Sequence, residues 1–183
     1  MPSIFSHAIV AVTLGKFYPA RKVPARFWVL AAICAALPDI DVIGFAFGIP
    51  YGALFGHRGL THSLLFAAVL SVLVVWLAFH ARWFSKQWFL LVVYFFIVTA
   101  SHGVLDAMTN GGLGVAFFSP FNNTRYFFSW RPIQVSPIGL DFLFSGPSWL
   151  ISEIKWIWIP AAVLVASASV YRKLMTDKSN SAP

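Results

Sequence analysis

Long apolar runs separated by short polar segments dominate the hydrophobic pattern of this chain. The runs cover residues 3–18, 27–49, 63–79, 88–108 and 154–171. A helix needs roughly 20 mostly apolar residues to cross the hydrocarbon core of a bilayer, so the first run is short and would be tilted or partly inserted. The pattern predicts an all-α, polytopic membrane helical bundle with about four to five membrane helices.

The composition supports a membrane protein. Hydrophobic residues make up 59% of the 183 residues and charged residues only 10%, whereas soluble domains carry about 25% charged residues. A net charge of +7 could indicate nucleic-acid binding, but the basic residues lie beside apolar runs, as cytoplasmic helix ends require. We therefore expect membrane lipids and no nucleic acid as partners, with one domain over residues 1–174 and a polar tail over 175–183.

Residues 109–147 differ from the rest of the chain because they combine glycines, prolines and many aromatic side chains. A segment of this length is long for a loop without structure, which favours a function for it. Its aromatic residues are typical of a layer lying at the lipid headgroups. Arg125 and Arg131 could bind headgroups there, although a structural role is the stronger expectation.

Ionisable side chains interrupt the apolar pattern at a few places. Residues 56–63 contain two histidines and an arginine between two apolar runs. Asp39 and Asp41 follow Pro38 inside the second run, where a carboxylate costs at least ~2.5–3.5 kcal/mol and so needs a partner. A polar connecting loop and a helix cap are the simpler explanations of these two stretches. A cap explains one aspartate near an interface but not a pair.

His102 and Asp106 lie near the end of the fourth run. Residues four apart share one face of a helix, about one turn from each other. Such a pair can form one edge of a metal site, and a buried histidine–aspartate hydrogen bond is the alternative.

The positions of the basic residues predict a topology. If the loop at 16–26 is cytoplasmic, segments 49–62 and 109–150 lie outside, and the loop at 80–87 and the C-terminus lie inside. Nine of the thirteen Lys and Arg residues are then cytoplasmic, as the positive-inside tendency requires. The same alternation leaves His80 inside and gathers the other candidate ligands at the outer side: His7, Asp39, Asp41, His57, His62, His102 and Asp106.

This mixture of nitrogen and oxygen ligands suits Zn²⁺, with Mn²⁺ or Fe²⁺ also possible. Seven candidates exceed the three or four ligands that one catalytic zinc takes, so we expect one or two ions, with the remaining groups acting as general base or support. His57, His62, His102 and Asp106 are the first choices as ligands, completed by His7 and one of the two aspartates at 39 and 41. Asp41, Arg58 and Asp106 are the candidate catalytic residues. Arg58 could bind a phosphate or oxyanion, or else lie among headgroups.

Together, His7 and residues 38–41, 57–63, 102–106 and 118–139 resemble the bacterial membrane-bound family of the YdjM type, over nearly the whole chain. The resemblance implies an inner-membrane protein with a metal-dependent hydrolase site. The order of ligands is more weakly similar to that of zinc-dependent phospholipase C. The chain lacks the later histidine pair and the His-x-x-x-Glu motif of that enzyme, so a full three-zinc site is not expected.

The function that these features favour is hydrolysis of a lipid or lipid-linked ester, with a phosphoester preferred, through a metal-activated water of pKa near ~7. The chain has no Gly-x-Ser-x-Gly elbow and so gives no support for a serine nucleophile. The alternative is a non-enzymatic metal-binding or metal-transport membrane protein. Transport would need ionisable residues that continue to the cytoplasmic side, which the third and fifth runs lack. The substrate and the oligomeric state stay open.

Overall fold

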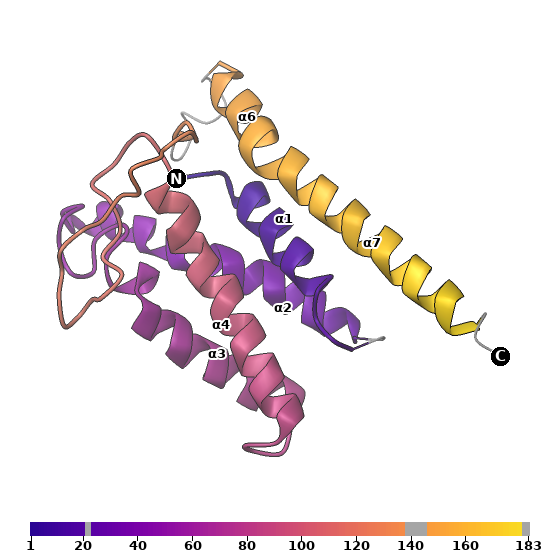
Figure 1. The fold of residues 1–183 in the computed structure, drawn as a ribbon. Helices are drawn as coiled ribbons and strands as arrows, with labels where there is room; N and C mark the ends of the chain where they lie inside the picture. The colour runs from indigo at the N-terminus through magenta and orange to yellow at the C-terminus, as the bar shows by residue number, and fades with distance from the viewer. Residues whose placement is uncertain (21–22, 138–145, 181–183) are drawn as a thin grey trace.

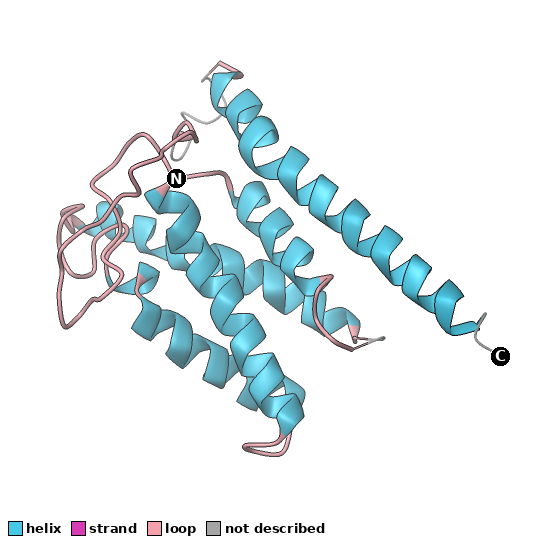
Figure 2. Cartoon of the chain, viewed as in Figure 1, coloured by secondary structure: helices cyan, strands magenta, loops and turns pink. Residues whose placement is uncertain are grey.

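The computed structural model of the protein describes residues 1–20, 23–137 and 146–180. Arg21 and Lys22 of the predicted basic loop, the end of the 118–139 motif and the last three residues of the tail lie outside this part. The described part is all-helical and has no β-strand, only two isolated bridges. Figure 2 shows helices joined by loops. The six α-helices are α1 (Ile4–Gly15), α2 (Ala25–Ala36), α3 (Leu64–Phe79), α4 (Lys86–Ala107), α6 (Ser148–Glu153) and α7 (Ile159–Asn180).

Three further helical segments complete the described elements. They are the 3₁₀ helices η1 (Leu37–Phe47) and η2 (Leu60–His62) and the π-helical η3 (Ile154–Trp158). Pro38 ends the α-helical geometry of α2 because it has no N–H to donate, and the chain continues directly into η1. The chain α6–η3–α7 is likewise continuous.

Three stretches are long and apolar enough to cross a membrane: Ala25–Phe47, Lys86–Ala107 and Ser148–Tyr171. The helices Ile4–Gly15 and Leu64–Phe79 are apolar but shorter. The 16 residues of α3 rise about 24 Å, which is less than the ~30 Å of a bilayer core. The prediction of a membrane helical bundle is therefore confirmed, with three long and two shorter apolar helices.

Helices α1 to α4 pack around an aromatic core. The ring of Phe27 stacks on that of Tyr94 with centroids 4.4 Å apart, and Phe95 packs against both. The Tyr94 hydroxyl donates a hydrogen bond to the Ala11 carbonyl across 3.0 Å. Helix α7 lies outside this group and contacts α1, as Figure 1 shows.

The junction of α6 and η3 is fastened to the start of α1 by a buried glutamate. Glu153 accepts hydrogen bonds from the Ser3 backbone N–H and from the hydroxyls of Ser3 and Ser6. Trp158 donates its indole N–H to the Ser6 hydroxyl across 2.8 Å. This contact places the long C-terminal helix beside the N-terminal one.

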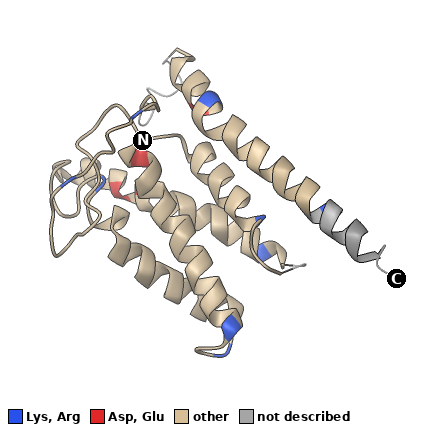
Figure 3. Cartoon of the chain, viewed as in Figure 1, with Lys and Arg blue, Asp and Glu red and all other residues tan. Residues whose placement is uncertain are grey.

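Successive helices alternate in direction, as the charge pattern predicts. The start of α1, the loop before α3 and the end of α4 lie at one end of the bundle, and the connections after α1 and α3 lie at the other (Figure 1). The acidic residues drawn in Figure 3 all lie at the first end. Helix α7 continues to Asn180, so the expected polar tail starts as helix rather than as a separate segment.

Candidate metal centre

All seven predicted ligands meet at the acidic end of the bundle. Helix α1 contributes one residue, η1 two, the loop before η2 and η2 itself one each, and α4 two. Six of the seven are buried, and the Asp39 side chain is 13% exposed. They are His7, Asp39, Asp41, His57, His62, His102 and Asp106. Four helical elements thus bring the seven predicted ligands together at one end of the bundle.

Four of these residues form a compact group, which we call the four-ligand group: Asp39, His62, His102 and Asp106. The two Nε2 atoms of the histidines lie 3.1 Å apart. The Asp39 Oδ1 atom is 3.6 Å from the Nε2 of His62 and 3.2 Å from that of His102. The Asp106 Oδ2 atom is 3.4 and 3.8 Å from the same two nitrogens.

These separations fit a tetrahedral ion. Bonds of about 2.0–2.1 Å to nitrogen and oxygen, arranged tetrahedrally, place ligand atoms roughly 3.3 Å from one another. Five of the six edges of the four-ligand group lie between 3.1 and 3.8 Å. The donor set is therefore suited to Zn²⁺ or a similar divalent cation.

The far side of each imidazole is held by an acceptor. The Nδ1 of His102 lies 2.6 Å from the Ala35 carbonyl oxygen, and the Nδ1 of His62 lies 3.1 Å from the Asp41 Oδ2. If each Nδ1–H donates to its acceptor, each Nε2 keeps a lone pair that faces the group. Such acceptors behind metal-binding histidines fix the tautomer and the orientation of the ring.

Asp41 therefore differs from Asp39. Its Oδ1 lies 2.7 Å from the Nδ1 of His57, and its Oδ2 accepts from the Arg58 backbone N–H and the Thr61 hydroxyl. Asp41, His57 and His62 form a second group whose ligand atoms lie within 4.8 Å of one another. Because its oxygens already accept these hydrogen bonds, Asp41 is better described as a support for two histidines than as a free ligand.

His7 lies against the four-ligand group without belonging to it. Its ring stacks on that of His102, with centroids 3.7 Å apart, and its Nε2 is 3.9 Å from the Asp106 Oδ1. Neither ring nitrogen of His7 has a hydrogen-bond partner among the described residues, whereas the Asp106 Oδ2 atom is 3.0 Å from the Arg58 Nε and 3.4 Å from the His62 Nε2. Buried polar atoms are seldom left without a partner, and a cation beside Asp106 would supply one to His7.

The electrostatics of His62 reflect the three carboxylates around it. Burial disfavours its charged form, but hydrogen bonds with Asp106, Asp39 and Asp41 outweigh burial and raise the pKa of His62 to about 10. The position therefore favours positive charge, which is what a cation site requires.

Arg58 is fully buried, so the expectation that it lies among headgroups is wrong. Its Nε lies 3.0 Å from the Asp106 Oδ2. Its other nitrogens donate to the Gly111 carbonyl across 2.9 Å and to the Thr109 hydroxyl across 3.1 Å. These donors face the protein, which favours a role in holding Asp106 over direct contact with a substrate.

Sequence reasoning did not select the residues that support these side chains. Thr61 donates to Asp41, and Thr109 accepts from Arg58. At Gly112 the backbone has a φ of +86°, and an added Cβ would lie 2.7 Å from Arg58 Nη1. The glycines at 111, 112 and 114 are typical of a turn and could have indicated this position, but single threonines carry no signal of this kind.

Arg125 joins the aromatic segment to the histidine loop. It donates to the backbone carbonyls of His57 and Tyr51, each across 2.9 Å. This is the structural role expected as the stronger alternative. Arg131 is exposed and lies over the Phe127 ring at 4.7 Å from its centroid.

Comparison with known proteins assigns the chain to a family. Residues 1–176 match the family described as YdjM inner membrane protein. The chain is 37% identical over 167 residues to the inner membrane protein YbcI of Escherichia coli (strain K12), which covers 90% of this chain and 95% of that protein. No solved structure matches it. With a family match over nearly its full length and such a relative, the chain belongs to the YdjM inner membrane protein family.

Proposed function

We propose that the protein is a metal-dependent hydrolase of the inner membrane that cleaves a lipid or lipid-linked ester, with a phosphoester preferred. The observation that carries the proposal is the spacing of the four-ligand group. Four donors from three separate elements lie at the mutual distances of a tetrahedral site. The Nε2 atoms of His62 and His102 lie 3.1 Å apart, with a carboxylate oxygen of Asp39 and one of Asp106 beside them.

The residues of the chain then have distinct tasks. Asp39, His62, His102 and Asp106 hold the cation, and Asp41 and Ala35 orient the two imidazoles. A divalent cation bound there supplies an activated water and offsets negative charge on an ester. His7 has no other hydrogen-bond partner among the described residues, so it is the group available to move a proton beside Asp106 or to hold a second ion.

The surface around the site favours a substrate that reaches the site from within the membrane. The segment that covers the four-ligand group exposes large aromatic side chains, with Phe121 at 85%, Trp130 at 58% and Phe118 at 52%. Tyr and Trp side chains are enriched at the level of lipid headgroups. A lipid whose polar group lies at the level of the headgroups would therefore reach the acidic end of the bundle without leaving the bilayer.

The placement of the site belongs to the same proposal. In the sequence, nine of the thirteen Lys and Arg residues belong to the segments 16–26, 80–87 and 172–178, which the topology assigns to the end remote from the carboxylates. Because cytoplasmic loops carry an excess of Lys and Arg, we place that end in the cytoplasm and the metal centre on the extracytoplasmic side.

Metal transport is the weaker alternative. Between the acidic end and the other end, the space among α1, α2 and α4 is filled by Phe27, Tyr94, Phe95 and their apolar neighbours. A pathway for ions needs polar groups along its length, and these described side chains provide a packed aromatic core instead.

Hydrolysis is tested with the full chain reconstituted in lipid nanodiscs. A panel of phospholipids and lipid-linked phosphates is incubated with it, and the released alcohol or phosphate is measured. Chelation should abolish turnover and added Zn²⁺ or Mn²⁺ should restore it. His62→Ala and Asp106→Ala each remove a proposed ligand and should each lose more than about a hundredfold in activity, because loss of a residue that only orients a ligand commonly costs about 10- to 100-fold. The matched control His80→Asn changes a histidine at the far end and should keep full activity. Turnover that survives chelation and both substitutions contradicts the proposal.

A further inference from the structure

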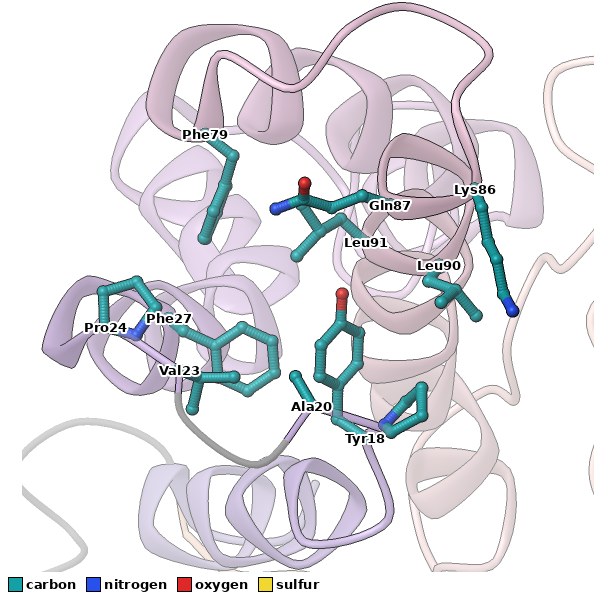
Figure 4. Close-up of a pocket in the computed structure, with 11 residues that line it drawn as sticks. Tyr18, Ala20, Val23, Pro24, Phe27, Phe79, Lys86, Gln87, Leu90 and Leu91 are labelled. Atoms are coloured by element: carbon teal, nitrogen blue, oxygen red, sulfur yellow. The ribbon is translucent and has the colours of Figure 1, made fainter.

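A cavity of about 690 Å³ lies at the end of the bundle remote from the metal centre. Figure 4 shows it between the connection after α1 and the ends of α2, α3 and α4 that meet there. Its walls are apolar and include Phe27, Phe79, Leu90 and Leu91. The volume lies within the roughly 300–1,000 Å³ of pockets that bury small amphiphilic ligands.

The cavity is not wholly apolar. The Tyr18 hydroxyl and the Gln87 carboxamide point into it in Figure 4, and Lys86 lies at its rim. The structure gives none of these three polar groups a hydrogen bond or an ion pair with another described residue. Apolar walls with unpaired polar groups on one side are suited to an amphiphilic molecule, which has an apolar part and a polar part.

Two basic residues lie beside this cavity. The Arg26 guanidinium lies 5.4 Å from the centroid of the Phe79 ring that forms one wall, and Lys86 is exposed. The described acidic side chains lie elsewhere: three are in the metal centre, and Glu153 is hydrogen-bonded to Ser3. The charge at the mouth is therefore uncompensated by any described carboxylate.

We propose that this cavity binds one anionic phospholipid. An acyl chain packs against Phe27, Phe79 and Leu91, and the phosphate group lies between Lys86 and Arg26. A soluble anion would leave the apolar walls uncovered, and a zwitterionic lipid would gain less from the two cations. The site is independent of the proposed hydrolysis, because the 22 residues of α4 separate the two ends by about 33 Å.

The test uses the full chain, purified in an uncharged detergent and freed of lipid. Equal amounts of phosphatidylglycerol and phosphatidylcholine with the same acyl chains are added, and the bound lipid is identified by native mass spectrometry. The wild type should retain one phosphatidylglycerol molecule in preference to phosphatidylcholine. Lys86→Gln should reduce that preference about fivefold, which corresponds to the ~1 kcal/mol of one basic residue at a lipid surface. Lys155→Gln removes a charge at the opposite end and should leave the preference unchanged.

A second pair of variants tests the cavity itself. Leu90→Trp fills the cavity and should abolish retention, whereas Phe89→Trp adds the same ring at the neighbouring exposed position and should not. Monodisperse elution and an unchanged helical circular dichroism spectrum establish folding, and Lys86→Gln decides the matter if Leu90→Trp fails to fold. Equal retention of the two lipids, or a preference that Lys86→Gln leaves intact, overturns the proposal.

Discussion

Two aspartates that are two residues apart have different tasks in this protein. Asp39 faces the Nε2 atoms of His62 and His102, and Asp41 faces the Nδ1 atoms of His57 and His62. In a 3₁₀ helix each residue advances by about 120°, so side chains two positions apart point in different directions. One carboxylate is therefore a ligand in our account and the other an orienting group.

This difference predicts unequal effects of the same substitution. Asp39→Asn should remove a ligand and abolish stoichiometric zinc binding. Asp41→Asn should keep the ligand set and weaken zinc binding about 10- to 100-fold, because His62 loses the acceptor that orients it. Competition with a chromophoric chelator measures both affinities. If Asp41→Asn abolishes binding and Asp39→Asn does not, the two roles are reversed.

Arg58 should be a stabilising residue. Arg58→Met leaves the buried Asp106 carboxylate without its cation, and removal of one partner of a buried pair costs about 3–5 kcal/mol. Arg131→Met changes an exposed arginine and should stay within about 0.5 kcal/mol. Unfolding of the metal-free protein in denaturant, followed by tryptophan fluorescence, compares the two. Equal stabilities would mean that the ion pair with Asp106 contributes little.

Much of the residue-scale picture could be predicted from the sequence, but not its details. The spacing of His102 and Asp106 on one helix face and the scarcity of other polar groups indicate that the ionisable side chains converge, and the structure brings these side chains together. The division of roles between Asp39 and Asp41 depends on the 3₁₀ geometry after Pro38. The burial of Arg58 depends on its own φ of 63°, and neither feature follows from hydrophobic periodicity.

At the scale of elements, backbone geometry and hydrogen bonds hold in place the described part of the segment after α4, residues 108–137. Gly112 has a φ of +86°. A Cβ added there would lie 2.7 Å from the Arg58 Nη1 atom and 2.7 Å from the Tyr51 hydroxyl oxygen. Arg125 ties the same segment to the loop before η2. The segment thereby covers the metal centre.

Gly112→Ala should destabilise the protein by about 1–3 kcal/mol, because the added methyl group meets strained backbone and two fixed side chains. Gly146→Ala is the matched control, since a Cβ there has nothing within 4 Å. Thermal unfolding of the two variants in the same detergent is the measurement. A Gly112→Ala variant as stable as Gly146→Ala would show that the loop adapts freely around Arg58.

The apolar runs predicted most helices to within a few residues, because burial in lipid demands continuous hydrophobic segments. The sequence pattern did not predict the helix geometry at two places. The second run becomes α2 followed by η1, and α7 extends to Asn180. The segment after α4 has no repeating pattern, so its path over the site could not be predicted from the periodicity of its residues.

At the scale of the whole molecule, the alternation of helices gathers the described carboxylates at one end of the bundle (Figure 3). Reporter fusions should establish which end faces the cytoplasm. A reporter inserted after Asn123, in the exposed part of the aromatic segment, should give an extracytoplasmic signal, and one at the C-terminus a cytoplasmic signal. The expectation rests on the sequence, in which nine of the thirteen Lys and Arg residues belong to the segments 16–26, 80–87 and 172–178 at the other end. Equal signals would contradict the alternation, and reversed signals would place the metal centre on the cytoplasmic side.

The metal centre itself is tested most directly by the metal content of the purified full chain. Inductively coupled plasma mass spectrometry on the wild type, His102→Ala and His80→Asn, each prepared in the same zinc-containing medium, compares a histidine of the four-ligand group with one at the far end of the bundle. Our account predicts at least one zinc ion per chain in the wild type and in His80→Asn, and a loss of that ion in His102→Ala. A wild-type chain without a stoichiometric metal ion, or a His102→Ala chain with the same content as the wild type, would contradict it.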